Sequence, residues 1–319
     1  MTMKAQEMLE NFPEQINPVD TPSLNLKDYA GIVFSGMGGS GIVGDLAKLV
    51  LEKSQIEVPV LSVRDYALPS YVKENWAVFC VSYSGNTEET LSIAQEALSR
   101  NIKPVCVSSG GKLKELASQK GLMHFALPSG YPPRYALGFM ISTVLSLIGM
   151  KDGLKACGEF LKEKRESIKK QAQGLAQRFE GYIPVVYVTP LMDAVALRWK
   201  TQINENAKTL CYTATLPELH HNEVVGLDNP ITRNLCTFVL LFDPEDHPRV
   251  LKRVEITEQI LKDLGVVPAL IKGEGDEFLN RLFYLIYLGD WASFYLSQLY
   301  GYDPIPVQVI DKIKRILSS

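Results

Sequence analysis

Two short stretches, Gly36-Met37-Gly38-Gly39-Ser40-Gly41 and Ser82-Tyr83-Ser84-Gly85-Asn86-Thr87, each stand between a strand-like apolar run and a helix-like segment. The first follows the apolar run Ile32–Phe34 and precedes helical apolar spacing over Ile42–Leu51, and the second has the same layout. The amide groups and the positive dipole end of a helix N-terminus bind phosphate well, and nearby hydroxyls add donors. Together the two stretches predict a cradle for the phosphate of a small phosphorylated sugar.

The glycine spacing of the first stretch also matches the G-x-G-x-x-G turn that binds dinucleotides, and Asp65 would then be the ribose-binding acid. A polar loop with an N-cap threonine is the alternative for the second stretch taken alone. A dinucleotide fold does not need three hydroxyls around one glycine, as the second stretch offers in Ser82, Ser84 and Thr87. The pair of stretches therefore favours the phosphate cradle.

Composition is that of a globular protein with room for about two domains in 319 residues, with 46% hydrophobic and 22% charged residues. A net charge of −3 and the lack of a long basic run argue against nucleic acid or an anionic membrane as partner. No stretch of sequence predicts a membrane span or export. The cysteines are scattered and odd in number, which predicts buried thiols in a reducing cytoplasm rather than disulfides: Cys80, Cys106, Cys157, Cys211 and Cys236.

Alternating strand-like and helix-like runs predict an α/β protein with parallel, doubly wound sheets. The strands expected in the first half are Ile32–Phe34, Val58–Val63, Val78–Val81, Pro104–Val107 and His124–Ala126. Those expected in the second half are Pro184–Val188, Thr237–Leu241 and Val267–Ile271. We expect a domain over residues 1–150, a connecting helix over 151–182 and a related, less regular domain over 183–319.

Three further segments carry residues suited to catalysis: Pro132-Pro133-Arg134, Asn204-Glu205-Asn206 on a predicted helix, and the loop Glu218–Glu223. Each has a plain structural interpretation as a surface cation, a solvated helix residue or a polar loop. A metal site of His220, His221 and Glu223 is not favoured, because adjacent side chains diverge and no H-x-x-x-H spacing is present.

These motifs, taken in order along nearly the whole chain, resemble the bifunctional phosphoglucose/phosphomannose isomerases. That family belongs to the phosphoglucose isomerase superfamily and is built from two sugar isomerase (SIS) domains. The resemblance rests on both cradle stretches, Pro-Pro-Arg134, Asn204-Glu205-Asn206, His221-Asn222-Glu223 and Ile313-Lys314. It implies two three-layer αβα domains, hexose 6-phosphate substrates, no cofactor, no metal and a place in glycolysis and gluconeogenesis.

The resemblance also implies roles for individual residues. Phosphate would be bound by Ser82, Ser84 and Thr87, with Gly38, Gly39 and Ser40 lining the site. Glu205 would be the isomerisation base, His221 and Lys314 would act in ring opening, and Arg134 would lie beside the reacting carbons. Lys312 is close to Lys314, and the latter fits the apolar-apolar-Lys ending better. The histidine would come from a neighbouring subunit, which implies a homodimer.

Aldose-ketose isomerisation needs these residue types, since a proton must move between adjacent carbons through an enediolate. A carboxylate such as Glu205 can carry the proton, Arg134 can stabilise the developing charge, and His221 can shuttle a proton to the ring oxygen, as imidazole side chains do near neutral pH. Two other functions stay open from the residues alone. One is a non-catalytic sugar-phosphate sensor built on SIS domains, and the other is an NAD(P)-dependent oxidoreductase built on the first glycine turn.

Overall fold

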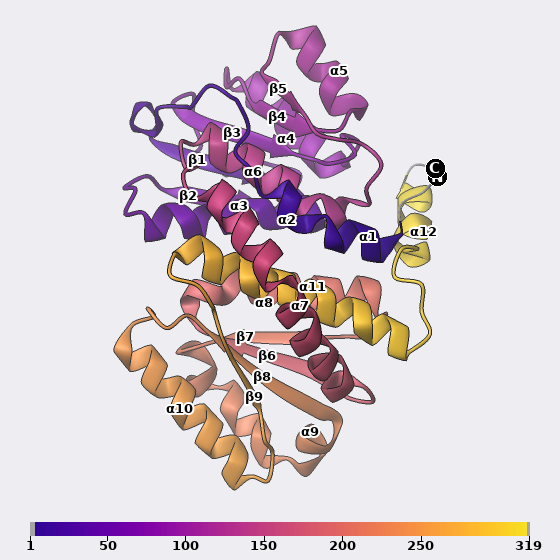
Figure 1. Cartoon of the computed structure of the whole chain (residues 1–319). Coiled ribbons are helices and arrows are strands. Elements are labelled where there is room, and N and C mark those ends of the chain that lie inside the picture. The colour runs from indigo at the N-terminus through magenta and orange to yellow at the C-terminus, as the bar shows by residue number, and fades with distance from the viewer. Residues whose placement is uncertain (1–3, 318–319) are drawn as a thin grey trace. The chain divides into compact units, whose positions relative to one another are not determined.

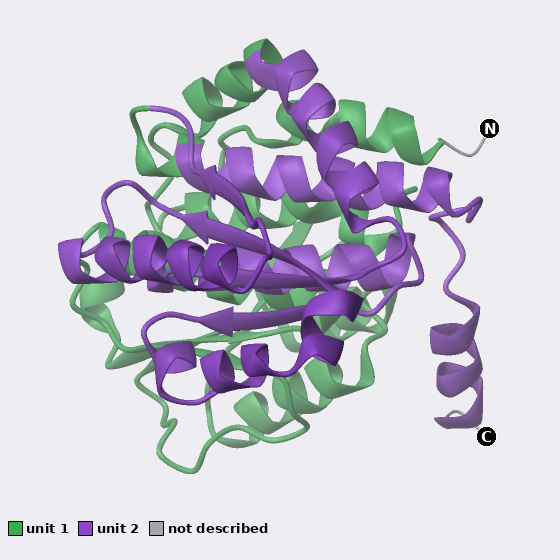
Figure 2. Cartoon of the chain, turned by 90° about the horizontal axis from the view of Figure 1, so that it is seen from below, with its two compact units in different colours: residues 1–163, 276–280 green, residues 164–275, 281–319 purple. Residues whose placement is uncertain are grey.

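The structure is a computed structural model that describes residues 4–317. It divides into two compact units, residues 1–163 with 276–280 and residues 164–275 with 281–319 (Figure 2). Each unit has a parallel sheet with helices on both faces, so the predicted α/β class with two parallel sheets is confirmed. The finer division at residues 150 and 182 stays a prediction. Across residues 4–317, no helix is both long and apolar enough to cross a bilayer.

The described part of unit 1 contains five parallel strands in the order β2-β1-β3-β4-β5 (Figure 1). The inner strands form from runs rich in valine, isoleucine or phenylalanine, the residues that suit a pleated, buried surface. The bounds of the five strands lie within two residues of those expected: β1 Gly31–Ser35, β2 Val60–Val63, β3 Trp76–Val81, β4 Val105–Ser108 and β5 His124–Ala126. Because β1 pairs with β3, Ser35 lies opposite Cys80 where both strands end.

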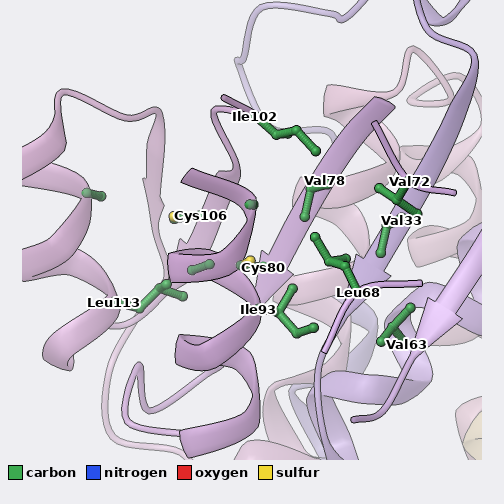
Figure 3. Packing of buried hydrophobic residues seen from close by; sticks show 13 residues of the cluster. Val33, Val63, Leu68, Val72, Val78, Cys80, Ile93, Ile102, Cys106 and Leu113 are labelled. Carbon is green, nitrogen blue, oxygen red and sulfur yellow. The ribbon is translucent and has the colours of Figure 1, made fainter. Parts of the chain in front are cut away.

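Helices cover both faces of this sheet. Helices α4 (Glu88–Ser99) and α5 (Gly111–Lys120) pack on one face in a buried cluster that includes Val33, Val78 and Leu113 (Figure 3). Successive strand side chains alternate, so Phe34 faces the other side, where α3 (Gly38–Lys53) and α6 (Leu137–Leu147) lie. There α3 approaches so closely that a Cβ at Gly44 would stand 2.6 Å from the Cβ of Phe34. The remaining elements are α1 Ala5–Glu10, α2 Phe12–Gln15, η1 Leu26–Asp28, η2 Pro133–Ala136 and the start of α7 (Leu154–Phe179).

The described part of unit 2 has four parallel strands in the order β7-β6-β8-β9, the same relative order as β2-β1-β3-β4. Their bounds are β6 Ile183–Val188, β7 Tyr212–Thr215, β8 Cys236–Phe242 and β9 Ala269–Lys272. The sequence analysis named no strand at β7. This edge strand consists of Tyr-Thr-Ala-Thr and is only partly buried, so it lacks the apolar run that marks the inner strands.

The two faces of the second sheet carry different elements. Val185 and Tyr187 of β6 point into a cluster with Leu219, Leu227 and helix α10. Helices α8 and α11 cover the opposite face (Figure 1). The bounds in chain order are η3 Pro190–Met192, α8 Asp193–Asn206, η4 Glu218–His221, η5 Glu223–Asp228, α9 Pro230–Leu235, α10 Pro248–Asp263, α11 Phe278–Leu299 and α12 Gln308–Leu317.

The loop that follows β8 is rich in carboxylates. Asp243 and Glu245 each bind the guanidinium of Arg281 at 2.7 Å. The backbone amide of Asp243 also donates to a carboxylate oxygen of Asp246 at 3.1 Å. In unit 1 the corresponding strand is β3, whose following turn carries hydroxyls, so the two sheets share their order but differ at this edge.

A buried ion pair joins α8 to α11. Arg198 donates from Nε and Nη2 to the two oxygens of Asp290, at 3.0 and 2.9 Å, and both side chains are buried. Next to it, Trp199 donates to the carbonyl of Leu285 at 2.8 Å. Gly289 lets the indole of Trp199 approach α11 closely, because a Cβ at this position would lie 2.2 Å from Nε1 of Trp199. The two helices are therefore held by directional bonds as well as by apolar packing.

Replacing one member of this pair leaves the other charge buried without its ion-pair partner. We expect Asp290→Ala to lower the free energy of unfolding by about 3–5 kcal/mol in urea denaturation. Glu255→Ala removes one partner of the exposed pair with Lys252 and should cost less than about 1 kcal/mol. Equal costs for the two variants would contradict the stabilising role of the buried pair.

Candidate active site

The two predicted cradle stretches lie side by side at the carboxyl ends of two inner strands of the unit 1 sheet. The first follows β1 and the second follows β3, which are hydrogen-bonded neighbours. The chain leaves these two strands in opposite directions across the sheet, toward β2 after β1 and toward β4 after β3. Ligands of open α/β sheets bind at such switch points, outside the carboxyl ends of the strands.

The first stretch is itself the first turn of a helix. Helix α3 begins at Gly38, four residues before the helical spacing noted in the sequence, and its N-cap Met37 makes no side-chain cap. The backbone closes tightly here, because a Cβ at Gly41 would lie 2.7 Å from the carbonyl oxygen of Gly36. Gly38 has φ +51°, and a Cβ there would meet no described atom within 4 Å. The helix start therefore faces open space with amide donors and no acidic residue in its first turn.

The second stretch holds its hydroxyls close to the start of α4. The hydroxyls of Ser82 and Thr87 lie 2.8 Å apart, and the Gly85 amide donates to Ser82 Oγ at 3.1 Å. The Asn86 amide donates to Ser84 Oγ at 3.2 Å. Thr87 is the N-cap of α4, yet its hydroxyl makes no cap bond within the helix. The structure thus gathers these predicted residues at a helix N-terminus.

A third turn, between β4 and α5, presses against the second stretch. Gly85 has φ +69°, and a Cβ there would stand 1.8 Å from the carbonyl oxygen of Gly110. A Cβ at Gly111 would likewise lie 2.4 Å from the carbonyl oxygen of Ser84. The amide of Leu113 donates to the Gly85 carbonyl at 2.9 Å. These glycines let two backbones meet without side chains between them.

Ser40 connects the two stretches rather than lining open space. It is buried, and its Oγ accepts a hydrogen bond of 3.0 Å from the amide of Tyr83. Arg134 lies beside the same turn, in η2, with 3% of its surface exposed. A Cβ at Gly39 would lie 3.0 Å from the backbone of Arg134, so the glycine lets η2 approach. Unit 1 therefore brings Arg134 to the cradle.

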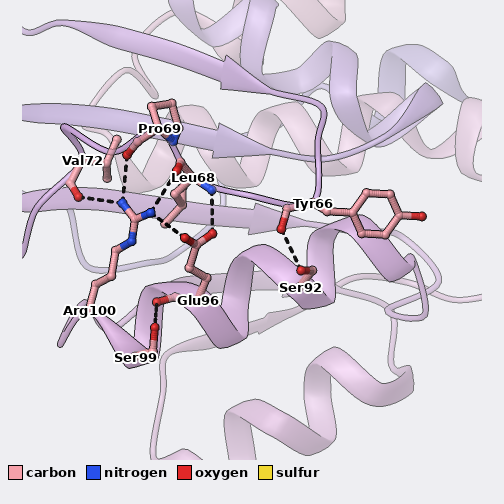
Figure 4. Close-up of polar contacts among 8 residues, drawn as sticks. All are labelled: Tyr66, Leu68, Pro69, Val72, Ser92, Glu96, Ser99 and Arg100. Carbon is pink, nitrogen blue, oxygen red and sulfur yellow. Dashed lines mark hydrogen bonds and ion pairs between the residues drawn. The ribbon is translucent and has the colours of Figure 1, made fainter.

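Helix α4 also fixes the loop between β2 and β3 beside the cradle (Figure 4). Arg100 donates to the carbonyls of Leu68, Pro69 and Val72 at 2.8–3.0 Å, while Glu96 accepts from the amide of Leu68. One helical turn nearer the cradle, Ser92 donates to the carbonyl of Tyr66 at 2.7 Å. Ser92, Glu96 and Arg100 lie four residues apart and so form one face of the helix.

Glu205 lies near the C-terminal end of α8 and is partly buried. The asparagines on either side are anchored. Asn204 accepts from the Cys211 amide at 3.0 Å, and Asn206 donates to Ser293 at 2.9 Å inside unit 2. The Asn-Glu-Asn sequence thus fixes the helix end that carries the carboxylate.

His220 and His221 differ in their surroundings. Both ring nitrogens of His220 are engaged, with Thr257 Oγ1 at 2.8 Å and Arg253 at 3.0 Å. Burial and the charge of Arg253 lower the pKa of His220, which stays neutral near pH 7. The side chain of His221 is exposed. Desolvation raises the pKa of Glu223, although its carboxylate accepts a hydrogen bond from Tyr187. His220 is a packing residue, which argues against the metal site considered above.

Within unit 2 the sheet lies between the helix that carries Glu205 and the segment that carries His221. Helix α8 begins at the carboxyl edge of β7, where Thr215 donates to Asp193, and ends at the opposite edge beside Cys211. Leu219, two residues before His221, packs on the face of the sheet that α10 covers. Since α8 covers the other face (Figure 1), the helix that carries Glu205 and the η4 segment that carries His221 lie on opposite faces of this sheet.

Lys314 lies on α12, the last helix described. The helix exposes apolar side chains along its length, including Val309, Ile313 and Ile316. Lys312 and Lys314 are both exposed, so their surroundings do not separate the two candidates.

Comparisons with known proteins place the whole chain. Residues 26–148 match the model described as SIS domain, and residues 168–317 match the bacterial phospho-glucose isomerase C-terminal SIS domain. The bifunctional phosphoglucose/phosphomannose isomerase of Aquifex aeolicus is 51% identical over 314 residues, covering 98% of each chain. The chain belongs to the bifunctional phosphoglucose/phosphomannose isomerase family.

A second relative agrees with this assignment, and a solved structure shows the same fold. The enzyme of that name from Caldicellulosiruptor bescii is 39% identical over 338 residues, again covering 98% of each chain. A solved structure of the C-terminal domain of glucosamine-fructose-6-phosphate aminotransferase from Francisella tularensis superposes with a TM-score of 0.73 at 15% identity. It covers 95% of this chain and 98% of that one, which shows a shared fold. The resemblance noted in the sequence is confirmed at the level of the family.

Sequence reasoning did not single out Tyr83, although the residue lies inside the second stretch. Its amide bonds to Ser40, and its side chain is buried against the loop that leads to Arg134. The available signal was a large aromatic residue between two small serines of a polar turn, where a solvated loop would carry none.

The contact between Gly85 and Gly110 gives a direct test of this part of the family fold. We expect Gly85→Ala to lower the free energy of unfolding by more than about 2 kcal/mol, from the positive φ and the backbone clash together. Gly121→Ala is the matched control, with φ +62° and no described atom within 4 Å, and should cost about 1 kcal/mol. Urea denaturation of both variants measures the difference, and a smaller loss for Gly85→Ala would show that the two turns are not in contact.

Proposed function

We propose that the protein reversibly isomerises glucose 6-phosphate and mannose 6-phosphate to fructose 6-phosphate. The observation that carries this is the pair of turns after β1 and β3 in a chain of this family. Glucose and mannose differ only in configuration at C2, which becomes planar in the enediolate. One site can therefore draw the same intermediate from both aldoses.

The phosphate binds at the N-termini of α3 and α4. Backbone amides around Gly38 and Gly39 and the hydroxyls of Ser82, Ser84 and Thr87 supply the donors. Because the phosphate is remote from C1 and C2, its binding energy orients the reacting carbons without changing their chemistry.

Proton transfer falls to Glu205, which takes the C2 proton and returns it to C1. Arg134 stabilises the charge that develops on the enediolate, a contribution of about 3–4 kcal/mol for a well-placed oxyanion donor. Ring opening needs one proton to be donated to the ring oxygen and another to be removed from the C1 hydroxyl. His221 and Lys314 carry out these two transfers, without a cofactor or metal.

The functional protein is a homodimer in which each active site combines Glu205 of one subunit with His221 of the other. The support is the sheet of unit 2, since α8, which carries Glu205, and η4, which carries His221, lie on its two faces within one subunit. We infer a cytoplasmic location, which the free thiols of Cys80 and the other cysteines and the phosphorylated substrates support. There it would serve glycolysis and gluconeogenesis.

A coupled assay starting from fructose 6-phosphate tests this function. Both glucose 6-phosphate and mannose 6-phosphate should form, each detected by its own coupling enzyme. Failure to form either aldose, with fructose 6-phosphate still bound, would instead support the non-catalytic sensor.

The cradle is tested by removing two hydroxyls. Ser84→Ala combined with Thr87→Ala should raise KM at least about 10-fold, because each hydrogen bond to a charged group contributes about 1.5–3 kcal/mol. Ser99→Ala, at the far end of α4, removes a hydroxyl that bonds only to the carbonyl of Glu96 among described partners and should leave KM unchanged. An unchanged KM in the double variant would remove the cradle from the proposal.

Mixing two inactive variants tests the shared site. Glu205→Gln and His221→Ala should each lower kcat at least about 10²-fold. When the two are unfolded together and refolded as a mixture, about one quarter of the wild-type activity should return, since half the dimers are mixed and each has one intact site. No recovery in mixtures shown to exchange subunits would mean that both residues act within one chain.

A further inference from the structure

Tyr83 belongs to the phosphate turn by its backbone. Its amide donates to Ser40 Oγ at 3.0 Å, which ties the turn after β3 to the turn after β1. Its carbonyl accepts from both the amide and the hydroxyl of Ser109, at 2.8 and 2.7 Å. The main chain of Tyr83 is therefore fixed on both sides within the cradle.

The side chain of Tyr83 serves a different segment. It is 5% exposed, and its hydroxyl donates to the carbonyl of Pro128 at 2.7 Å while accepting from the amide of Tyr131 at 3.1 Å. Burial, the largest influence, raises the pKa of Tyr83, so the phenol stays protonated and able to donate at neutral pH. The Tyr83 hydroxyl thus ties the loop between β5 and η2 to the turn after β3 through two hydrogen bonds.

That loop leads into η2, which carries Arg134. Its far end is fixed as well, because the side chain of Gln15 donates to the carbonyl of Tyr135 at 2.9 Å and the backbone of Arg134 lies against Gly39. Between these anchors the loop contains Gly130 at φ +97°, a conformation that ordinary residues avoid. The phenol of Tyr83 restrains the half of the loop that Gln15 does not reach.

We propose that Tyr83 is a positioning residue that sets the place of Arg134 relative to the phosphate bound by the neighbouring backbone. The proposal rests on the proposed function, in which Arg134 stabilises the enediolate. Phosphate and Arg134 meet opposite ends of one substrate, so their spacing decides whether the guanidinium reaches the charge on C1 and C2. A displacement of about 1 Å in such an arrangement can cost about 10²-fold in rate.

Tyr83→Phe tests this with little change in volume. We expect kcat to fall about 10- to 100-fold while KM and the affinity for 6-phosphogluconate stay within about two-fold, because the phosphate donors are untouched. Binding of 6-phosphogluconate by the same preparation also shows that unit 1 is folded. The control is Tyr300→Phe, which removes a hydroxyl that accepts from the backbone amide of Gly181 at 2.8 Å in unit 2 rather than bonding to this loop, and which should retain kcat.

A double-mutant cycle with Arg134→Lys separates positioning from a general structural role. If Tyr83 acts through Arg134, the two losses in kcat should not multiply, and Tyr83→Phe should cost little in the Arg134→Lys background. Losses that multiply, or a normal kcat in Tyr83→Phe, would overturn the positioning role alone. A normal kcat in Arg134→Lys would instead overturn the role of Arg134 in the proposed function.

Discussion

The pairing of β1 with β3 is the constraint on which the site in unit 1 depends. With Ser35 opposite Cys80, β1 ends within one residue of the level at which β3 ends, and the two following turns start from adjacent points. The hydrogen bond from Tyr83 to Ser40 can form only in this register, while the close backbone approach at Gly85 depends on the pairing of β3 with β4. A shift of one residue would separate the turns and reverse which side chains face α4.

Much of this arrangement could be predicted from the sequence because the relevant signals are local. Glycines such as Gly38 and Gly85 and hydroxyls such as Ser84 mark turns at strand ends, and apolar runs give the inner strands to within two residues. The edge strand β7 was missed, since Tyr212–Thr215 carries no apolar run and is defined by its partner β6. The helical spacing begins four residues after the start of α3, because glycine disfavours the helix and gives no apolar signal. The glycine-rich first turn of α3 depends on the segments packed against it.

The catalytic candidates differ in how much of their structural surroundings could be predicted from the nearby sequence. Arg134 follows two prolines, and the structure adds that its backbone needs Gly39 as a neighbour, almost a hundred residues earlier in the chain. The division between His220, a neutral packing residue, and His221, an exposed one, depends on Arg253 and Thr257 of a distant helix. Such long-range contacts have no local signal, and the roles of Glu205, His221 and Lys314 stay proposals.

The contrast between the two sheets bears on which strand end can bind an anion. The turn after β3 offers hydroxyls and amides, whereas the loop after β8 pairs Asp243 and Glu245 with Arg281. The guanidinium of Arg281, the group there that could attract a phosphate, is already neutralised by these carboxylates and is buried. Two sheets of like strand order therefore serve different ends, since one leaves donors available for an anion and the other uses its cation to hold its own loop.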